Sequence, residues 1–119
     1  MFFFGKKKSV VPQYYIPSNV DNPKREYQVT DEETLFLNAL LEQSKQLKGE
    51  YQLVRLSDGT INISYNRYPI GTIKLQGKIK HMMVMTTIYD TKTIEGELPD
   101  FIDGIKYWLY YIKRFLKEK

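Results

Sequence analysis

The sequence has no cysteine and a single histidine, His81, among its 119 residues. The lack of cysteine excludes a disulfide framework, thiolate zinc sites and thiol catalysis, and it agrees with a reducing cytoplasm. A single histidine excludes a two-histidine metal site. No apolar run approaches the length of a membrane span, and residues 2–8 place phenylalanines before lysines, the reverse of a secretory signal. We therefore expect a cytoplasmic domain with no membrane partner.

The chain divides into a short arm and one domain. Pro12, Pro17 and Pro23 interrupt any helix in residues 1–29, which are expected to form an irregular arm or an edge strand. Residues 30–119 are expected to form a single α+β domain, long enough to bury a core without disulfides or metal. Neither an internal repeat nor a low-complexity tract is present.

Two helices are predicted at the ends of this domain. Thr30 and Glu33 form an S/T-x-x-E capping box, and a stripe of leucines and Phe36 follows, so we expect a helix over 31–48 with Gly49 just beyond it. A second apolar stripe predicts a helix from Pro99 or Asp100 to Lys117. Its acidic start and basic end match the helix dipole.

Between the helices, turn signals predict an antiparallel meander. Asp58-Gly59 is a strong two-residue turn. This turn would set Leu56 opposite Ile61 and Val54 opposite Ile63, and would send Tyr51, Leu53, Arg55, Asn62 and Ser64 to the other face of the sheet.

A second turn at Asn66-Arg67 would bring Tyr65 opposite Tyr68. Beyond this turn, the apolar residues move to the other set of alternate positions along the strand. Such a change predicts a β-bulge at Gly71. The apolar run within 79–89 predicts a strand that is covered on both faces. The expected fold is therefore α+β in two layers, with a helix, a three- to four-stranded antiparallel meander and a C-terminal helix (α-β-β-β-β-α).

This helix–sheet–helix order over residues 31–118 resembles the topology of double-stranded-RNA-binding domains. Those domains carry basic residues at the start of their second helix, whereas this chain has Glu97-Leu98-Pro99-Asp100, which would repel phosphate. A sheet followed by a long helix is also similar to single-strand-binding coactivator modules. Both resemblances imply a topology and no function.

Basic residues and aromatic rings predict a possible nucleic-acid surface on the sheet. Residues 55–80 carry five basic side chains and one acidic side chain. Sheets that bind single strands hold phosphates with cations and stack bases on aromatic rings. The candidates for this role are Tyr51, Arg55, Asn62, Arg67, Lys74, Lys78 and Lys80. The alternative is an ordinary solvated sheet face.

Tyrosines on the last helix predict a protein-binding surface. Tyrosine and arginine are enriched in interfaces because they bury a large area and keep a polar group. The candidates are Tyr107, Tyr110, Tyr111 and Arg114, which lie mainly off the core stripe. A protein partner or a second copy of the chain, forming a dimer, is the expected occupant, and the rings could instead pack on neighbouring elements.

Catalytic chemistry is the weakest hypothesis. Asp58 with Asp90-Thr91-Lys92 is a D…D-x-K pattern typical of metal-dependent nucleases, but Asp58 is needed by its turn. Four acidic residues at 95–103 could hold a divalent cation, although capping of the last helix explains them more simply. No nucleophile–base pair is present. We therefore expect a non-enzymatic domain without catalytic or metal residues, cofactor or small-molecule substrate, whose first function is protein binding and whose alternative is nucleic-acid binding.

Overall fold

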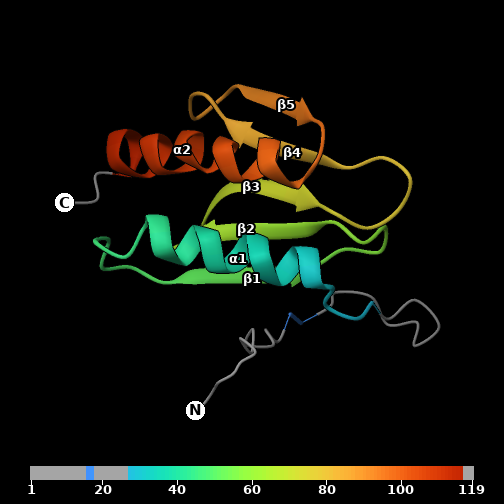
Figure 1. Ribbon diagram of the computed structural model, residues 1–119. Coiled ribbons are helices and arrows are strands. Elements are labelled where there is room, and N and C mark those ends of the chain that lie inside the picture. The colour runs from blue at the N-terminus through green and yellow to red at the C-terminus, as the bar shows by residue number, and fades with distance from the viewer. Residues whose placement is uncertain (1–15, 18–26, 117–119) are drawn as a thin grey trace, which may run out of the picture.

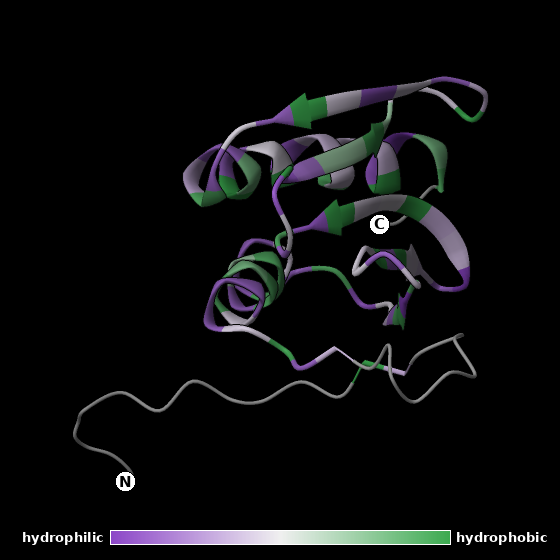
Figure 2. Cartoon of the chain, turned by 90° about the vertical axis from the view of Figure 1, so that its right-hand side faces the viewer, coloured by the Kyte–Doolittle hydropathy of each residue, from purple (hydrophilic) through white to green (hydrophobic). Residues whose placement is uncertain are grey.

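The computed structural model describes residues 16–17 and 27–116 of the chain (Figure 1). The described elements follow one another as α1 (Asp31–Gln43), β1 (Tyr51–Arg55), β2 (Ile61–Tyr65), β3 (Tyr68–Lys74), β4 (His81–Met85), β5 (Thr91–Glu95) and α2 (Leu98–Phe115). The strands form one antiparallel sheet in the order β1-β2-β3-β4-β5. Both helices lie on the same face of it, α1 over β1 and β2 and α2 over β3 to β5 (Figures 1 and 2). The predicted two-layer α+β class is confirmed.

The sheet has five strands, where three to four were predicted. The run over 79–89 forms only β4, because Thr86 N–H donates to the Asp90 carbonyl at 2.9 Å and the chain turns back into β5. The Thr87 hydroxyl accepts the Asp90 N–H at 3.1 Å and closes this turn. A five-residue strand whose only large apolar residue is Ile94 carries little hydrophobic signal, so it was missed. Among the described helices, neither is long and apolar enough to cross a bilayer.

Helix α1 begins where it was predicted and ends earlier. The Thr30 hydroxyl accepts Glu33 N–H at 3.1 Å, and the Glu33 carboxylate accepts Thr30 N–H at 3.0 Å, so the capping box is confirmed. The helix ends at Gln43, not at residue 48. The Ser44 hydroxyl donates to the Leu40 carbonyl at 2.6 Å, and a serine bonded to the backbone in this way competes with helix continuation. Residues 44–50 therefore form a connecting loop.

The predicted register of the first hairpin is wrong by one residue. Arg55 pairs with Ile61 and Leu53 with Ile63, because the loop spans residues 56–60 and is closed by a bond from Leu56 N–H to the Thr60 carbonyl at 2.7 Å. A shift of one residue exchanges the two faces of a strand. Tyr51, Leu53 and Arg55 therefore face the helices.

The second hairpin has the predicted turn, and its bulge lies at Ile70, one residue before the predicted Gly71. Tyr65 pairs with Tyr68, and Asn66 and Arg67 have positive φ angles of 51° and 72°, as a tight hairpin turn requires. The register then shifts so that Ile63 pairs with Gly71 and Ser64 with Pro69. This bulge lets Ile70 be fully buried while Ile73, of opposite parity, is also buried.

Trp108 lies at the centre of the core and connects the three parts of the fold. Its indole N–H donates to the Met83 carbonyl at 3.0 Å, and its ring meets Phe36 of α1 edge-to-face at 5.5 Å. The apolar run in β4 was predicted to be covered on both faces. Met82 and Val84 are fully buried under α2, whereas the alternate residues His81, Met83 and Met85 are half-buried, so burial alternates as in a strand covered on one face.

Candidate interaction surfaces and an apolar pocket

Arg55 is not on an exposed surface, contrary to the nucleic-acid prediction. Only 2% of its side chain is exposed, and its guanidinium binds both carboxylate oxygens of Glu33, at 2.6 and 3.0 Å. Nη1 also donates to the Gly59 carbonyl at 2.9 Å. A buried guanidinium needs such a partner because an unpaired buried charge is costly. Arg55 is thus a structural residue that joins the first hairpin to the start of α1.

The remaining nucleic-acid candidates do not all lie on one surface. Tyr51 faces α1, whereas Asn62 and Lys74 lie on the outer face of the sheet, and Lys74 is 4.0 Å from Asp58. Arg67 is exposed at the β2–β3 turn and Lys78 is exposed in the β3–β4 loop. Arg67 lies at one end of β3, and Lys74 and Lys78 lie at the other end, so these cations do not form a continuous track for a phosphate backbone.

Lys80 forms ion pairs with two carboxylates. Its Nζ lies 3.1 Å from Glu32 of α1 and 3.0 Å from Glu97 at the start of α2. Hydrogen bonds to Glu97 and then to Glu32 raise the pKa of the Lys80 ammonium above its ordinary value. Lys80 therefore connects the N-terminal ends of the two helices, and its charge is already compensated.

The tyrosines of α2 divide into two kinds. Tyr111 is buried, with 4% exposed, and stacks on Phe115 at 5.2 Å, so it belongs to the core and not to the predicted interface. Tyr110 is 61% exposed, Tyr107 is 37% exposed, and Arg114 is exposed beside them. Three of the four predicted interface residues therefore lie on the outer side of α2.

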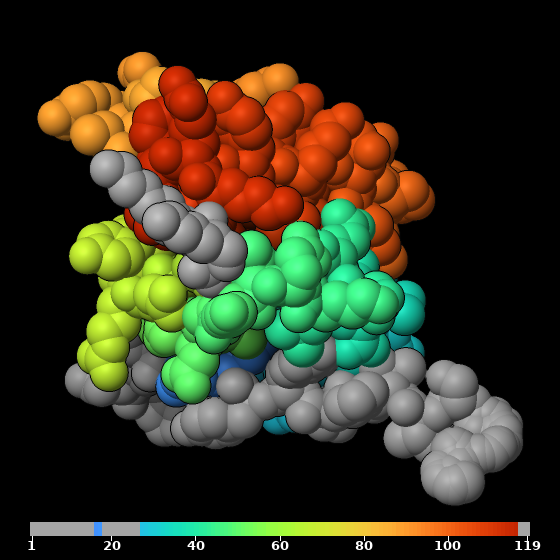
Figure 3. All heavy atoms as spheres, turned by 90° about the vertical axis from the view of Figure 1, so that its left-hand side faces the viewer, coloured from blue at the N-terminus to red at the C-terminus, as the bar shows by residue number. Residues whose placement is uncertain are grey.

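The β4–β5 hairpin adds apolar side chains next to these tyrosines. Ile88 and Tyr89 at its tip are 53% and 88% exposed. The hairpin projects beside the second half of α2 (Figure 3), and a mostly apolar hollow of about 460 Å³ lies between them. We call this region the hairpin–helix surface, which comprises Met85, Ile88, Tyr89, Tyr107 and Tyr110. Sequence reasoning missed the hairpin tip, although an Ile-Tyr pair inside a turn was a usable signal.

Cations surround the hairpin–helix surface. Nζ of Lys92 lies 5.1 Å from the centre of the Tyr107 ring, and Nζ of Lys106 lies 5.5 Å from it, so both make cation–π contacts. Lys113 and Arg114 are exposed in the last turns of the same helix. Asp103 compensates Lys106 at 3.4 Å. The surface is therefore aromatic and positively charged.

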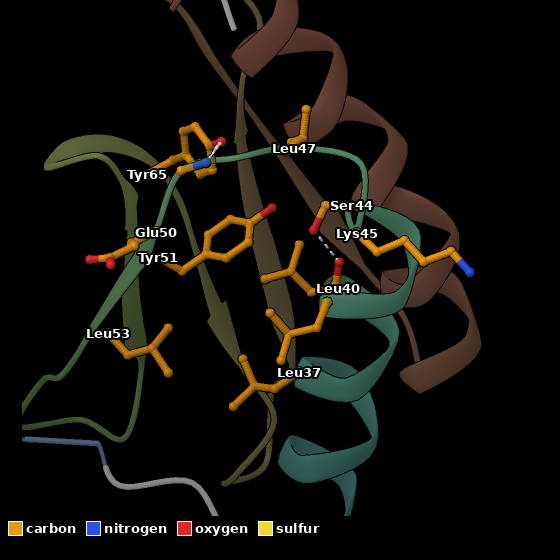
Figure 4. Close-up of a pocket in the computed structure, with 11 residues that line it drawn as sticks. Leu37, Leu40, Ser44, Lys45, Leu47, Glu50, Tyr51, Leu53 and Tyr65 are labelled. Atoms are coloured by element: carbon orange, nitrogen blue, oxygen red, sulfur yellow. Dashed lines mark hydrogen bonds between the residues drawn. The ribbon is translucent and has the colours of Figure 1, made fainter. Parts of the chain in front are cut away.

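A separate apolar pocket of about 450 Å³ lies between α1 and β1 (Figure 4). Its walls come from α1, the 44–50 loop, β1 and β2. The apolar side chains that line it are Leu37, Leu40, Leu41, Leu47, Tyr51, Leu53 and Tyr65. No sequence pattern predicted this pocket, because it depends on the early end of α1 and on the shifted register of β1.

The catalytic and metal hypotheses gain no support from the described residues. Asp58 lies near Lys74, which pairs with His81 at the start of β4, whereas Asp90 follows the far end of that strand. Across the described part of the chain, no three acidic or histidine side chains come together to form a metal site. Two of the four acidic residues form the capping box of α2, in which Asp100 accepts the Glu97 N–H at 2.9 Å.

No family model matches the chain, and no significant match is found among the curated proteins or the solved structures.

Proposed function

We propose that this chain is a non-enzymatic, cytoplasmic protein-binding domain whose contact region is the hairpin–helix surface. The observation that carries the proposal is the clustering of exposed apolar side chains on this surface. Four side chains that core packing would normally bury gather on two adjacent elements, namely Ile88, Tyr89, Tyr107 and Tyr110. Contiguous exposed patches of this kind mark interaction sites, and tyrosines are among the residues that dominate binding energy.

The charge of the surface supports an acidic protein partner. Lys92, Lys106, Lys113 and Arg114 surround the rings, and a partner that brings carboxylates would be attracted to them. A two-fold dimer through this surface would instead place like charges opposite each other. A second copy of the chain, which the sequence also suggested as the partner, is therefore an outcome that the experiment distinguishes.

The positions of the basic residues on the sheet favour protein binding over nucleic-acid binding. Arg55 is buried and Lys80 is paired with two carboxylates, so two of the strongest phosphate ligands are already occupied. The basic end of α2 keeps nucleic-acid binding as the competing hypothesis.

The test uses a displayed library of short peptides rich in Asp, Glu and aromatic residues. We expect it to yield peptides that bind with dissociation constants in the micromolar range and bind more weakly in high salt. Tyr110→Ala should weaken the selected peptides by about tenfold or more. Tyr68→Ala is the matched control, because Tyr68 is 60% exposed but lies at the β2–β3 turn, away from the surface, and it should have no effect.

Two results would overturn the proposal. One is a set of peptides whose affinity is unchanged by Tyr110→Ala. The other is tight, salt-dependent binding of a single-stranded oligonucleotide that Tyr110→Ala abolishes while no peptide binds, which would favour the nucleic-acid alternative. Sedimentation of the same samples would reveal a dimer that Tyr110→Ala dissociates, and that result would replace the acidic partner with a second copy of the chain.

A further inference from the structure

We propose that the pocket between α1 and β1 is a second binding site, which takes an uncharged, largely apolar small molecule carrying an aromatic ring. This site is independent of the hairpin–helix surface, because no residue lines both. Its volume of about 450 Å³ falls in the range of known ligand pockets, roughly 300–1,000 Å³.

The loop over 44–50 keeps the pocket open. At one end Ser44 is bonded to the Leu40 carbonyl. At the other end Gly49 N–H donates to the Tyr65 hydroxyl at 2.6 Å, and Glu50 N–H donates to Asn66 Oδ1 at 2.9 Å. Because both ends are fixed to the rest of the fold, Leu47 cannot easily collapse toward β1, and a preformed site reduces the cost of binding.

Gly49 is required for this arrangement. A Cβ atom at this position would lie 2.5 Å from the Tyr65 ring and from the side chain of Asn66. Only glycine allows the loop to approach the end of β2 so closely. The glycine predicted to end α1 instead closes one end of the pocket.

The interior of the pocket carries no charged group, which defines the ligand as uncharged. The only charged lining residues, Lys45 and Glu50, are exposed and point away from the interior (Figure 4). Lys45 is directed to Glu42, which its Nζ contacts at 3.0 Å. An ionised ligand group would lose its hydration without gaining a partner.

The two tyrosines define the aromatic character of the ligand. Tyr51 and Tyr65 meet edge-to-face, with ring centres 5.1 Å apart and planes at 64°, and form one wall of the pocket. The leucines that offer accessible apolar surface to a ligand are Leu41 of α1, which is 47% exposed, and the half-buried Leu47. A flat ring between leucines and tyrosine rings would gain both apolar burial and favourable aromatic contact.

The probe for this site is N-phenyl-1-naphthylamine, an uncharged aromatic dye whose emission rises in apolar surroundings. Titration of the full chain should give saturable binding at one site with a micromolar dissociation constant. Leu41→Glu should weaken it by about tenfold or more, because it places a charge on the apolar wall. Leu35→Glu is the matched control, since Leu35 and Leu41 are both on α1 and both 47% exposed, but only Leu41 lines the pocket.

Amide chemical shifts locate the probe independently of the variants. We expect the dye to shift the amide resonances of Ser44 and Gly49, which lie at the two ends of the pocket, and not those of Ile88 and Tyr110. Non-saturable binding, an equal effect of Leu35→Glu and Leu41→Glu, or shifts confined to the hairpin–helix surface would each overturn the proposal. So would the absence of binding, because a hollow that another part of the chain fills is not a ligand site.

Discussion

The β1–β2 and β2–β3 connections both contain residues that favour tight turns, yet only the second forms one. Asn66 and Arg67 take the two positive φ angles of a two-residue hairpin, and the pairing of Tyr65 with Tyr68 follows directly. Asp58 and Gly59 are instead part of a five-residue loop, in which the Asp58 carboxylate accepts the Thr60 N–H at 3.0 Å. The turn residues set the register of the second hairpin but not the register of the first.

The difference comes from what each hairpin must bury. In the second hairpin, the apolar parity and the turn agree once the bulge is included. In the first, the register that the turn favours would leave Glu33 under the sheet without a cation. The observed register brings Arg55 to Glu33, and leaving that buried carboxylate without its cation would cost more than the preference of a single turn contributes.

The largest effect is expected when the buried pair is broken. Arg55→Met leaves the Glu33 carboxylate buried without its cation, so the free energy of unfolding should fall by about 3–5 kcal/mol. Urea denaturation followed by circular dichroism measures this loss.

The double variant Glu33→Gln with Arg55→Met tests whether the pair, and not only the volume of the side chain, sets the stability. It removes both charges and keeps an amide that can reach the Thr30 N–H, so it should recover about 1–3 kcal/mol of the loss. The Nε atom of Arg55 has no hydrogen-bond partner among the described residues, which makes removal of this arginine less costly than removal of a fully bonded one. A double variant as unstable as Arg55→Met would contradict the charge argument.

The second largest loss of stability is expected at the β-bulge that shifts the register between β2 and β3. At Gly71 (φ +157°) an added Cβ would collide with the Met83 carbonyl and the Trp108 indole nitrogen. Gly71→Ala should therefore destabilise the fold by about 2–4 kcal/mol, through steric overlap and backbone strain.

Gly77→Ala is the control for the bulge. Gly77 also has a positive φ (+98°), but its nearest neighbour is the Lys74 side chain at 3.5 Å. It should cost about 1–2 kcal/mol from backbone strain alone. Equal losses of stability in the two alanine variants would show that contact with Trp108 adds nothing. Near-ultraviolet circular dichroism of the single tryptophan would test the same contact, because its signal depends on the packing of the indole ring.

The parts of the fold that were predictable are those fixed by local chemistry. The capping box at Thr30, the Asn66-Arg67 turn, the bulge next to Gly71 and the last helix depend on residues close together in sequence. The register of β1 and the burial of Arg55 depend on Glu33, 22 residues away, and no local pattern indicates that contact. For the same reason the exposure of Tyr107 and Tyr110 on α2 could be predicted, whereas the pocket could not.

The smallest effect on stability is expected from the Asp58 carboxylate in the first loop, which is exposed, unlike the buried pair of Glu33 and Arg55. Hydrogen bonds from Thr60 lower the pKa of Asp58 below 3.8, with a smaller contribution from Lys74. A lowered folded-state pKa stabilises the fold above the unfolded value, and this contribution is lost as the pH falls below 3.8 through the folded value. Because the side chain is 59% exposed, solvent screening limits the contribution to less than ~1 kcal/mol. Asp58→Asn should therefore be slightly less stable than the parent chain at pH 7 and equal to it well below pH 3.8, as measured by urea midpoints at the two pH values. A difference that stays constant with pH would show that the Asp58 charge plays no part in the loop, and that the hydrogen bond to Thr60 alone holds the shape of the first hairpin.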